Sequence, residues 1–104
     1  MNATAGTTES SDCLISVSSH TKNEIHIESV VLDQFGDQIR HVLLTTLQAY
    51  NITHIKVECF DKGALDYTIK SRLETALKRG GYIEYKLFVY SRKYAKYDSK
   101  LRRI

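Results

Sequence analysis

The sequence of 104 residues contains no proline, no tryptophan and only two cysteines. It also has no long apolar run, whereas a membrane-spanning helix needs about 20 consecutive apolar residues, so such a helix is excluded. The first residues carry no basic group and no apolar segment, so we expect no secretory signal and a cytoplasmic location. Cys13 and Cys59 are accordingly predicted to be reduced thiols rather than a disulfide.

Groupings of catalytic or metal-binding side chains are missing as well. The four histidines are scattered and lack the short spacings of a metal site, and no base is placed beside either cysteine. Both cysteines alternate in phase with apolar residues, which is typical of small core side chains. We therefore expect no metal site, and the spacing of residues points to no catalytic group.

The formal net charge of +3 is unevenly distributed along the chain. Residues 1–81 carry eight Lys and Arg against ten Asp and Glu, whereas residues 82–104 carry seven against two. The body is therefore mildly acidic and the last segment is basic. That segment also contains five tyrosines, and basic residues interleaved with aromatic ones are typical of nucleic-acid-binding surfaces.

Periodic patterns predict a small α+β domain. Alternation of apolar and polar residues predicts strands over residues 13–17, 25–27 and 55–59, with the first two joined as a β-hairpin. Residues 83–89 alternate in the same way and could form a fourth strand. Residues 1–11 are small and polar, so we expect them to form a flexible arm.

Two helices are predicted from apolar residues at spacings of three and four. The first covers residues 34–50, with Asp33 as its N-cap and Asn51 as the left-handed residue that ends it. The second begins at Asp61 as its N-cap and ends at Gly80 and Gly81. The two predicted apolar stripes are Phe35, Ile39, Val42, Leu43, Leu47 and Tyr50, and Leu65, Ile69, Leu73, Ala76 and Leu77.

These elements fit a two-layer sandwich, in which a three- to four-stranded sheet has both helices on one face. The predicted organisation is an arm over residues 1–11, an α+β domain over residues 12–81, and a possible extra strand and basic tail over residues 82–104.

Four blocks of the sequence match the pattern of one known family. Residues 5–12 read A-G-T-T-E-S-S-D, close to the family pattern A-G-T-x-E-S-G-D. Residues 34–40 (Q-F-G-D-Q-I-R), 61–66 (D-K-G-A-L-D) and 72–74 (R-L-E) match three further blocks, in the same order. On these blocks the chain resembles the citrate lyase acyl carrier proteins, the gamma subunits of that enzyme.

The resemblance implies that Ser10 carries a covalently attached 2'-(5''-phosphoribosyl)-3'-dephospho-CoA group, in phosphodiester linkage. Residues 12–81 would then be a carrier domain that takes acetyl and citryl thioesters between the alpha subunit, an acyl transferase, and the beta subunit, a citryl lyase. No residue of the chain would be catalytic. The implied modifying partner is a prosthetic-group transferase, and we expect Glu9 and Asp12 to be recognised by its basic groups.

Two features depart from the family pattern. Ser11 stands where the family commonly has glycine, so it is the competing attachment site. The basic segment after Gly81 matches no block, and it leaves open the alternative of a small α/β nucleic-acid-binding module that uses its sheet and basic aromatic tail. The acidic body and the lack of the glycine–aromatic signature of an RNA-recognition motif argue against this alternative.

Overall fold

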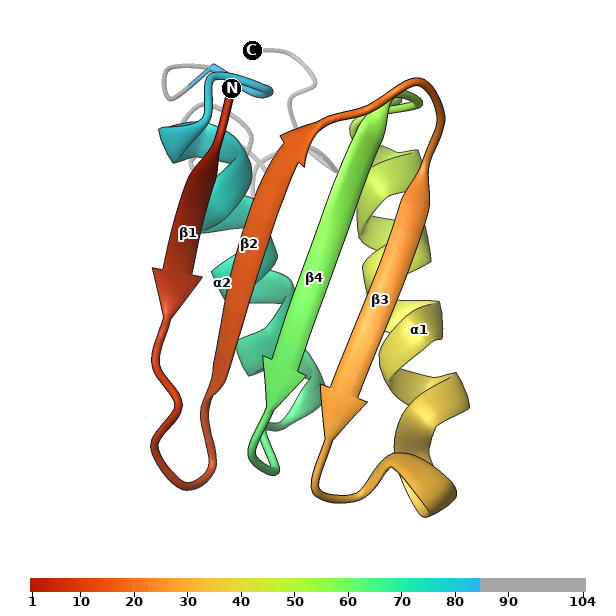
Figure 1. The fold of residues 1–104 in the computed structure, drawn as a ribbon, viewed down its shortest axis with the longest axis vertical. Coiled ribbons are helices and arrows are strands. Elements are labelled where there is room, and N and C mark those ends of the chain that lie inside the picture. The colour runs from red at the N-terminus through yellow and green to blue at the C-terminus, as the bar shows by residue number, and fades with distance from the viewer. Residues whose placement is uncertain (85–104) are drawn as a thin grey trace, which may run out of the picture.

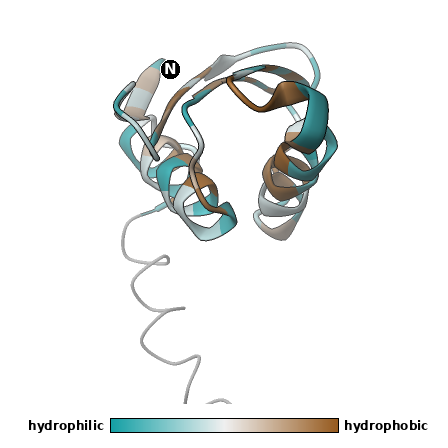
Figure 2. Cartoon of the chain, turned by 90° about the horizontal axis from the view of Figure 1, so that it is seen from below, coloured by the Kyte–Doolittle hydropathy of each residue, from teal (hydrophilic) through white to brown (hydrophobic). Residues whose placement is uncertain are grey.

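The computed structural model describes residues 1–84, which fold into one sheet with two helices (Figure 1). In chain order the elements are β1 (Ala3–Gly6), β2 (Cys13–Ser19), β3 (Glu24–Ser29), α1 (Leu32–Ala49), β4 (Ile55–Asp61) and α2 (Asp66–Arg79). Both helices cover the same face of the sheet, as the end-on view in Figure 2 shows. The predicted two-layer α+β architecture is confirmed. In this part of the chain no helix is long and apolar enough to cross a membrane.

The strand order of the sheet is β1-β2-β4-β3. β2 is antiparallel to both of its neighbours, and β3 runs parallel to β4, to which α1 connects it. The predicted hairpin between residues 13–17 and 25–27 is therefore wrong, because β4 lies between these strands. Alternation identifies which residues form strands but does not identify their partners. The central place suits β4, since Ile55, Val57 and Cys59 are all fully buried under the helices.

The N-terminal residues supply the fourth strand. β1 pairs with the outer edge of β2, with Ala3 opposite Val17 and Gly6 opposite Leu14. The prediction of a flexible arm over residues 1–11 is therefore wrong for Ala3–Gly6, and Ala5 is part of the core. Small side chains cannot build a core of their own, but their backbone can complete the hydrogen bonds of an open sheet edge. Of the alternative fourth strand at residues 83–89, residues 85–89 lie outside the described residues.

The core lies between the sheet and the helices. It consists of Ala5, Cys13, Ile15, Val17, Ile39, Leu43, Leu47, Ile55, Val57, Cys59, Ile69, Leu73, Ala76, Leu77 and Ile83. Most of the two predicted helical stripes therefore pack as expected. Phe35 and Leu65 do not, since 50% and 66% of their surfaces are exposed. Both lie at the N-terminal end of their helix, beyond the edge of the core.

The helix ends confirm some of the predicted signals and correct others. Asn51 has a φ of 58° directly after the C-cap of α1, and α2 ends before Gly81, whose φ is 82°. Asp33 is not the N-cap of α1, because the helix already begins at Leu32. The actual N-caps of α1 and α2 are Val31 and Leu65, and neither forms a side-chain capping hydrogen bond.

Candidate modification site and the groove beside it

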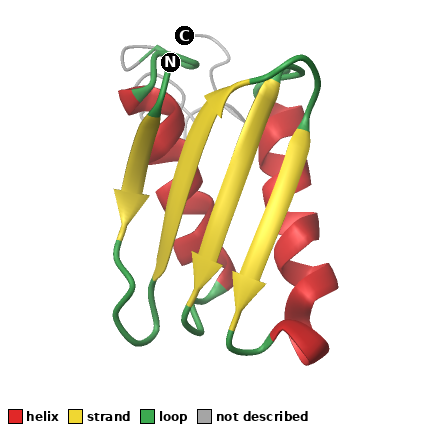
Figure 3. Cartoon of the chain, viewed as in Figure 1, coloured by secondary structure: helices red, strands yellow, loops and turns green. Residues whose placement is uncertain are grey.

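Three loops meet at one end of the sheet, where β1, β3 and β4 end (Figure 3). They are residues 7–12 between β1 and β2, residues 30–31 between β3 and α1, and residues 62–65 between β4 and α2. Parts of two of the four sequence blocks described above, residues 5–12 and 61–66, are thereby brought together at this end. The loop over residues 7–12, called the Ser10 loop below, carries the predicted attachment residue.

Ser10 lies at the tip of its loop, in a tight turn over residues 9–12. The amide of Asp12 closes the turn by donating to the carbonyl oxygen of Glu9 at 3.1 Å. Ser11 has a φ of 65°, and a positive φ at the third position is typical of a type II turn, where glycine is favoured. The Ser10 side chain is exposed and forms no hydrogen bond with any described residue. Its hydroxyl is thus open to an approaching enzyme.

The carboxylate of Asp12 holds this turn in place. Arg72 of α2 donates from Nε to Oδ1 at 2.9 Å and from a terminal nitrogen to Oδ2 at 3.3 Å. The Thr7 hydroxyl and the Cys13 amide donate to the same carboxylate at 2.8 and 2.7 Å. The hydrogen bond from Arg72, followed by the one from Thr7, holds the pKa of Asp12 well below its ordinary value. Asp12 is therefore an ionised anchor that joins the Ser10 loop to α2.

The Ser10 loop is also bonded to the neighbouring loop over residues 62–65. The amide of Ser11 donates to the carbonyl oxygen of Lys62 at 2.9 Å, and the amide of Lys62 donates to the carbonyl oxygen of Asp12 at 2.9 Å. These bonds continue the pairing of β2 with β4, whose last matched residues are Cys13 and Asp61. Ser10 is consequently fixed next to the loop that leads into α2.

Asp61 orders that second loop from within, since only 2% of its surface is exposed. Its carboxylate accepts hydrogen bonds from the Ser29 hydroxyl at 2.7 Å and from the amides of Gly63 and Ala64 at 3.1 and 2.9 Å. The prediction that Asp61 caps the second helix is wrong, because α2 begins five residues later, at Asp66. The chain needs these intervening residues to pass from the sheet layer to the helix layer.

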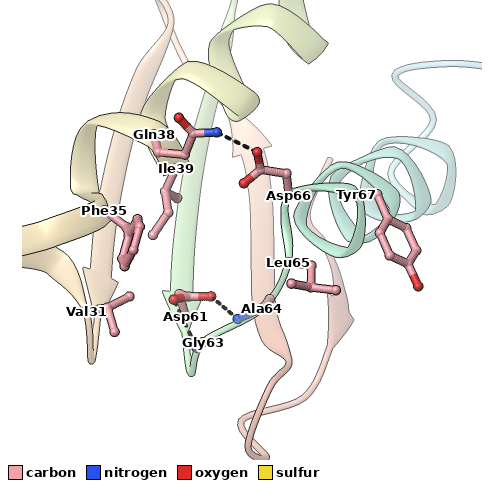
Figure 4. Close-up of a pocket in the computed structure, with 10 residues that line it drawn as sticks. All are labelled: Val31, Phe35, Gln38, Ile39, Asp61, Gly63, Ala64, Leu65, Asp66 and Tyr67. Atoms are coloured by element: carbon pink, nitrogen blue, oxygen red, sulfur yellow. Dashed lines mark hydrogen bonds between the residues drawn. The ribbon is translucent and has the colours of Figure 1, made fainter.

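A groove opens between the first turns of α1 and α2, beside the loop over residues 62–65 (Figure 4). Its volume is about 760 Å³, which falls within the size range of small-molecule sites. Gln38 of α1 donates to Asp66 of α2 at 2.5 Å across the groove. The walls are otherwise mainly apolar and include Val31, Phe35, Ile39, Ala64, Leu65 and Tyr67.

The sequence patterns predicted neither the groove nor the role of Asp12, and the attachment at Ser10 stays a prediction. The carboxylate of Asp12 is occupied by Arg72 of the same chain, so its predicted recognition by basic groups of a transferase does not fit this geometry. The Glu9 side chain is exposed and stays a candidate for that role. Leu65 points to the groove only once the start of α2 is known, because an apolar residue is disfavoured at an N-cap, whereas the sequence pattern placed it in a helical stripe.

The remaining reactive side chains are not brought to Ser10. Cys13 and Cys59 are free and buried, and hydrogen bonding with Cys13, together with burial, raises the pKa of Cys59. His20 and His26 both contact the Glu24 carboxylate, at the opposite end of the sheet. Within residues 1–84 no three His, Cys, Asp or Glu side chains are grouped so as to hold a metal ion.

Comparison with known proteins shows which proteins this chain resembles. The family described as "ACP: Malonate decarboxylase delta subunit (MdcD)" matches residues 1–80. The citrate lyase acyl carrier protein of Lactiplantibacillus plantarum is 51% identical over 78 residues, which cover 74% of this chain and 81% of that protein. The protein of the same name from Treponema denticola is 43% identical over 77 residues, which cover 74% of this chain and 88% of that protein.

A solved structure has the same fold. It is the crystal structure of a Pseudomonas malonate decarboxylase hetero-tetramer in complex with malonate. The TM-score is 0.64 at 16% sequence identity, and the match covers 75% of this chain and 81% of the other. At this low identity the likeness shows the fold alone.

These matches define the class of the protein as an acyl carrier, a subunit of a multi-subunit complex that bears a prosthetic group and is not itself catalytic. Within that class, the chain belongs to the citrate lyase acyl carrier protein family. The resemblance found in the four sequence blocks is thereby confirmed.

The nucleic-acid alternative gains no support from the sheet. By the strand register, Glu24, Glu28 and Glu58 lie on the face that the helices leave open, with Lys56 as the only lysine of that face in the described strands. An acidic face repels a phosphate backbone. The basic tail that suggested this alternative lies outside the described residues.

Proposed function

We propose that this chain carries acetyl and citryl groups in citrate lyase, in the cytoplasm, on a 2'-(5''-phosphoribosyl)-3'-dephospho-CoA group attached to Ser10. It would present them in turn to the alpha subunit, an acyl transferase, and to the beta subunit, a citryl lyase. When bound, the group supplies the thiol on which an acyl group is held as a thioester. The observation that carries the proposal is the exposed Ser10 hydroxyl at the tip of a turn bonded to the folded domain.

The surroundings of Ser10 fit a long covalent group with an anionic linkage. The Ser10 side chain has no hydrogen bond that modification would break within residues 1–84. Lys62 is exposed on the neighbouring loop and offers a positive charge for the phosphodiester. Its own amide and carbonyl oxygen fix it to Asp12 and Ser11, so the charge stays on the loop next to the attachment site.

The ordered Ser10 loop bears on how the attached group would reach the catalytic subunits. Both ends of the Ser10 loop belong to paired strands, and Asp12 is held by Arg72. The reach between two catalytic sites therefore comes from the attached group rather than from a flexible protein arm. Tethering through a fixed base keeps the effective concentration of the acyl group high at both sites.

The proposal is tested by intact mass and peptide mapping of the chain produced together with a prosthetic-group transferase. The expected result is one adduct of the mass of the group, on the peptide that contains Ser10. Ser10→Ala should abolish the adduct and citrate lyase activity, while Ser11→Ala, the matched control one residue away, should keep both. Circular dichroism should show that both variants fold, because neither hydroxyl contributes a hydrogen bond within residues 1–84.

Three results would contradict the proposal. An adduct that persists in Ser10→Ala and disappears in Ser11→Ala would move the attachment to Ser11. Full lyase activity of the double variant Ser10→Ala, Ser11→Ala in the assembled complex would exclude both serines as the attachment site. Salt-dependent RNA binding by a chain that never acquires an adduct would favour the nucleic-acid alternative.

A further inference from the structure

Two apolar residues occupy helix N-caps where stability favours other residues. Val31 and Leu65 are the N-caps of α1 and α2, and neither makes a capping hydrogen bond through its side chain. Serine, threonine, aspartate and asparagine are preferred there, and aliphatic residues are the least favoured. Leu65 is also 66% exposed, so burial within this chain does not compensate for the missing cap. The folding of residues 1–84 does not explain why this position holds a leucine.

Both of these residues line the same groove. Phe35 and Tyr67, which are also exposed, join them in its lining, and Ile39 continues the apolar surface towards the core. Five exposed large apolar residues gather in or next to the first turns of the two helices, namely Val30, Leu32, Phe35, Leu65 and Tyr67. A concave apolar surface of this kind is typical of a ligand site rather than of ordinary solvent-facing structure.

The loop over residues 62–65 connects the groove to the proposed attachment site. Lys62, whose backbone is bonded to Ser11 and Asp12, directly follows Asp61 and directly precedes Gly63, and both of these line the groove. A group attached to Ser10 therefore starts one loop away from the groove. Because the attachment is covalent, such a group would remain at high effective concentration there between transfers.

We propose that this groove binds the apolar arm of the group carried on Ser10, a pantetheine-like chain that ends in a thioester. The inference rests on the proposed attachment at Ser10. Val31, Phe35 and Leu65 contact the arm and keep water from the thioester while it is not in a catalytic subunit. The phosphates stay on the Ser10 loop near Lys62, because Asp61 and Asp66 make the groove unfavourable for negative charge.

A tethered arm explains the groove better than a partner protein does. The groove is concave and of small-molecule size, whereas protein docking surfaces extend over a broader area. The charges of the surface also match the two parts of the attached group. Lys62 lies near the anionic linkage, and the mainly apolar groove would hold the neutral arm.

The test measures how fast iodoacetamide alkylates the thiol of the deacylated, modified chain. Cys13 and Cys59 are buried, so the arm thiol is the reactive one while the protein is folded. Leu65→Ser removes apolar surface from the groove and places a favourable N-cap residue before α2, which guards against unfolding. Leu44→Ser is the matched control, because Leu44 is an exposed leucine of α1 that does not line the groove.

We expect Leu65→Ser to be alkylated about fivefold faster than the unchanged chain, the factor that corresponds to roughly 1 kcal/mol of lost contact. Leu44→Ser should react at the unchanged rate. In the modified chain, nuclear Overhauser effects should connect the methyl groups of the arm with those of Leu65 and Ile39, and they should be absent from Ser10→Ala.

Equal alkylation rates in all three proteins, with no such Overhauser effects, would overturn the inference. A Leu65→Ser chain that is alkylated at the same rate as the unchanged chain, but assembles poorly with the alpha and beta subunits, would also overturn the inference. That result would assign the groove to a partner protein. Peptide mapping of the same samples separates the two proposals. An adduct missing from Ser10 contradicts the proposed attachment, whereas an adduct on Ser10 without groove contacts contradicts only this inference.

Discussion

Arg72 and Asp12, which are 60 residues apart in sequence, form a bidentate ion pair that ties the Ser10 loop to α2. This contact gives a physical role to the short R-L-E block. Arg72 holds the loop, Leu73 is fully buried in the core, and Glu74 accepts a hydrogen bond from the Tyr50 hydroxyl at 2.8 Å. The sequence blocks over residues 5–12 and 72–74 are therefore joined by direct contact in the folded chain.

Removal of the charge of Asp12 should destabilise the chain in a pH-dependent way. Asp12→Asn is expected to lower the free energy of unfolding by about 1 kcal/mol at pH 7, since Arg72 remains partly exposed. The pKa of Asp12 is lowered in the folded state. Its contribution is therefore present above the unfolded-state pKa of about 3.9 and is lost as the pH falls through the folded value. Urea unfolding at pH 7 and at steps below pH 4 checks this, and a constant difference between the two proteins would contradict it.

Replacement of Ser11 by glycine should stabilise the turn. Ser11 has a φ of 65°, a conformation that is unfavourable by about 1–2 kcal/mol for a residue with a side chain. Glycine relieves that strain but has more freedom in the unfolded chain, so we expect a net gain of about 0.5–1 kcal/mol. Ser10→Gly is the control, because Ser10 has no positive φ and should lose stability. Urea unfolding compares them, and an equal loss in both variants would argue against a strained turn.

Loss of the Asp61 carboxylate should loosen the loop over residues 62–65. Asp61→Ala leaves the Ser29 hydroxyl and the amides of Gly63 and Ala64 without their acceptor, and the site is buried. We expect a loss of about 2–3 kcal/mol in the free energy of unfolding. Hydrogen exchange should show faster exchange of the Gly63 and Ala64 amides than in the unchanged chain. Unaltered exchange at both amides would show that the loop is held by other contacts.

The two cysteines should be inert in the folded protein. Cys13 and Cys59 are buried, and the raised pKa of Cys59 disfavours its thiolate, the form that reacts with alkylating reagents. Iodoacetamide at pH 8 should therefore add no mass to the unmodified chain until denaturant unfolds it, after which two additions are expected. Rapid alkylation of the native chain would show that this part of the core opens readily.

Local sequence patterns were reliable where a single segment decides the outcome. The alternation of Cys13, Ile15 and Val17 placed a strand correctly, and Asn51 ended α1 in the predicted left-handed conformation. The pattern around Ser10 predicted an exposed, flexible segment, and the structure shows an exposed residue in an ordered turn instead. By contrast, Asp61 was wrongly predicted to be the N-cap of α2. Periodicity does not predict how many residues the loop before α2 contains.

Sequence by itself determined that the segments of β2, β3, β4, α1 and α2 become strands and helices, and its four blocks determined the family. Only the tertiary structure decided that β4 separates β2 from β3, that Ala3–Gly6 complete the sheet, and that Arg72 holds Asp12. The physical reason is that periodicity reports the local path of the backbone. The partners of strands and charges follow from burying all the apolar faces and satisfying all the polar groups together, and the same packing left a groove beside the loop over residues 62–65.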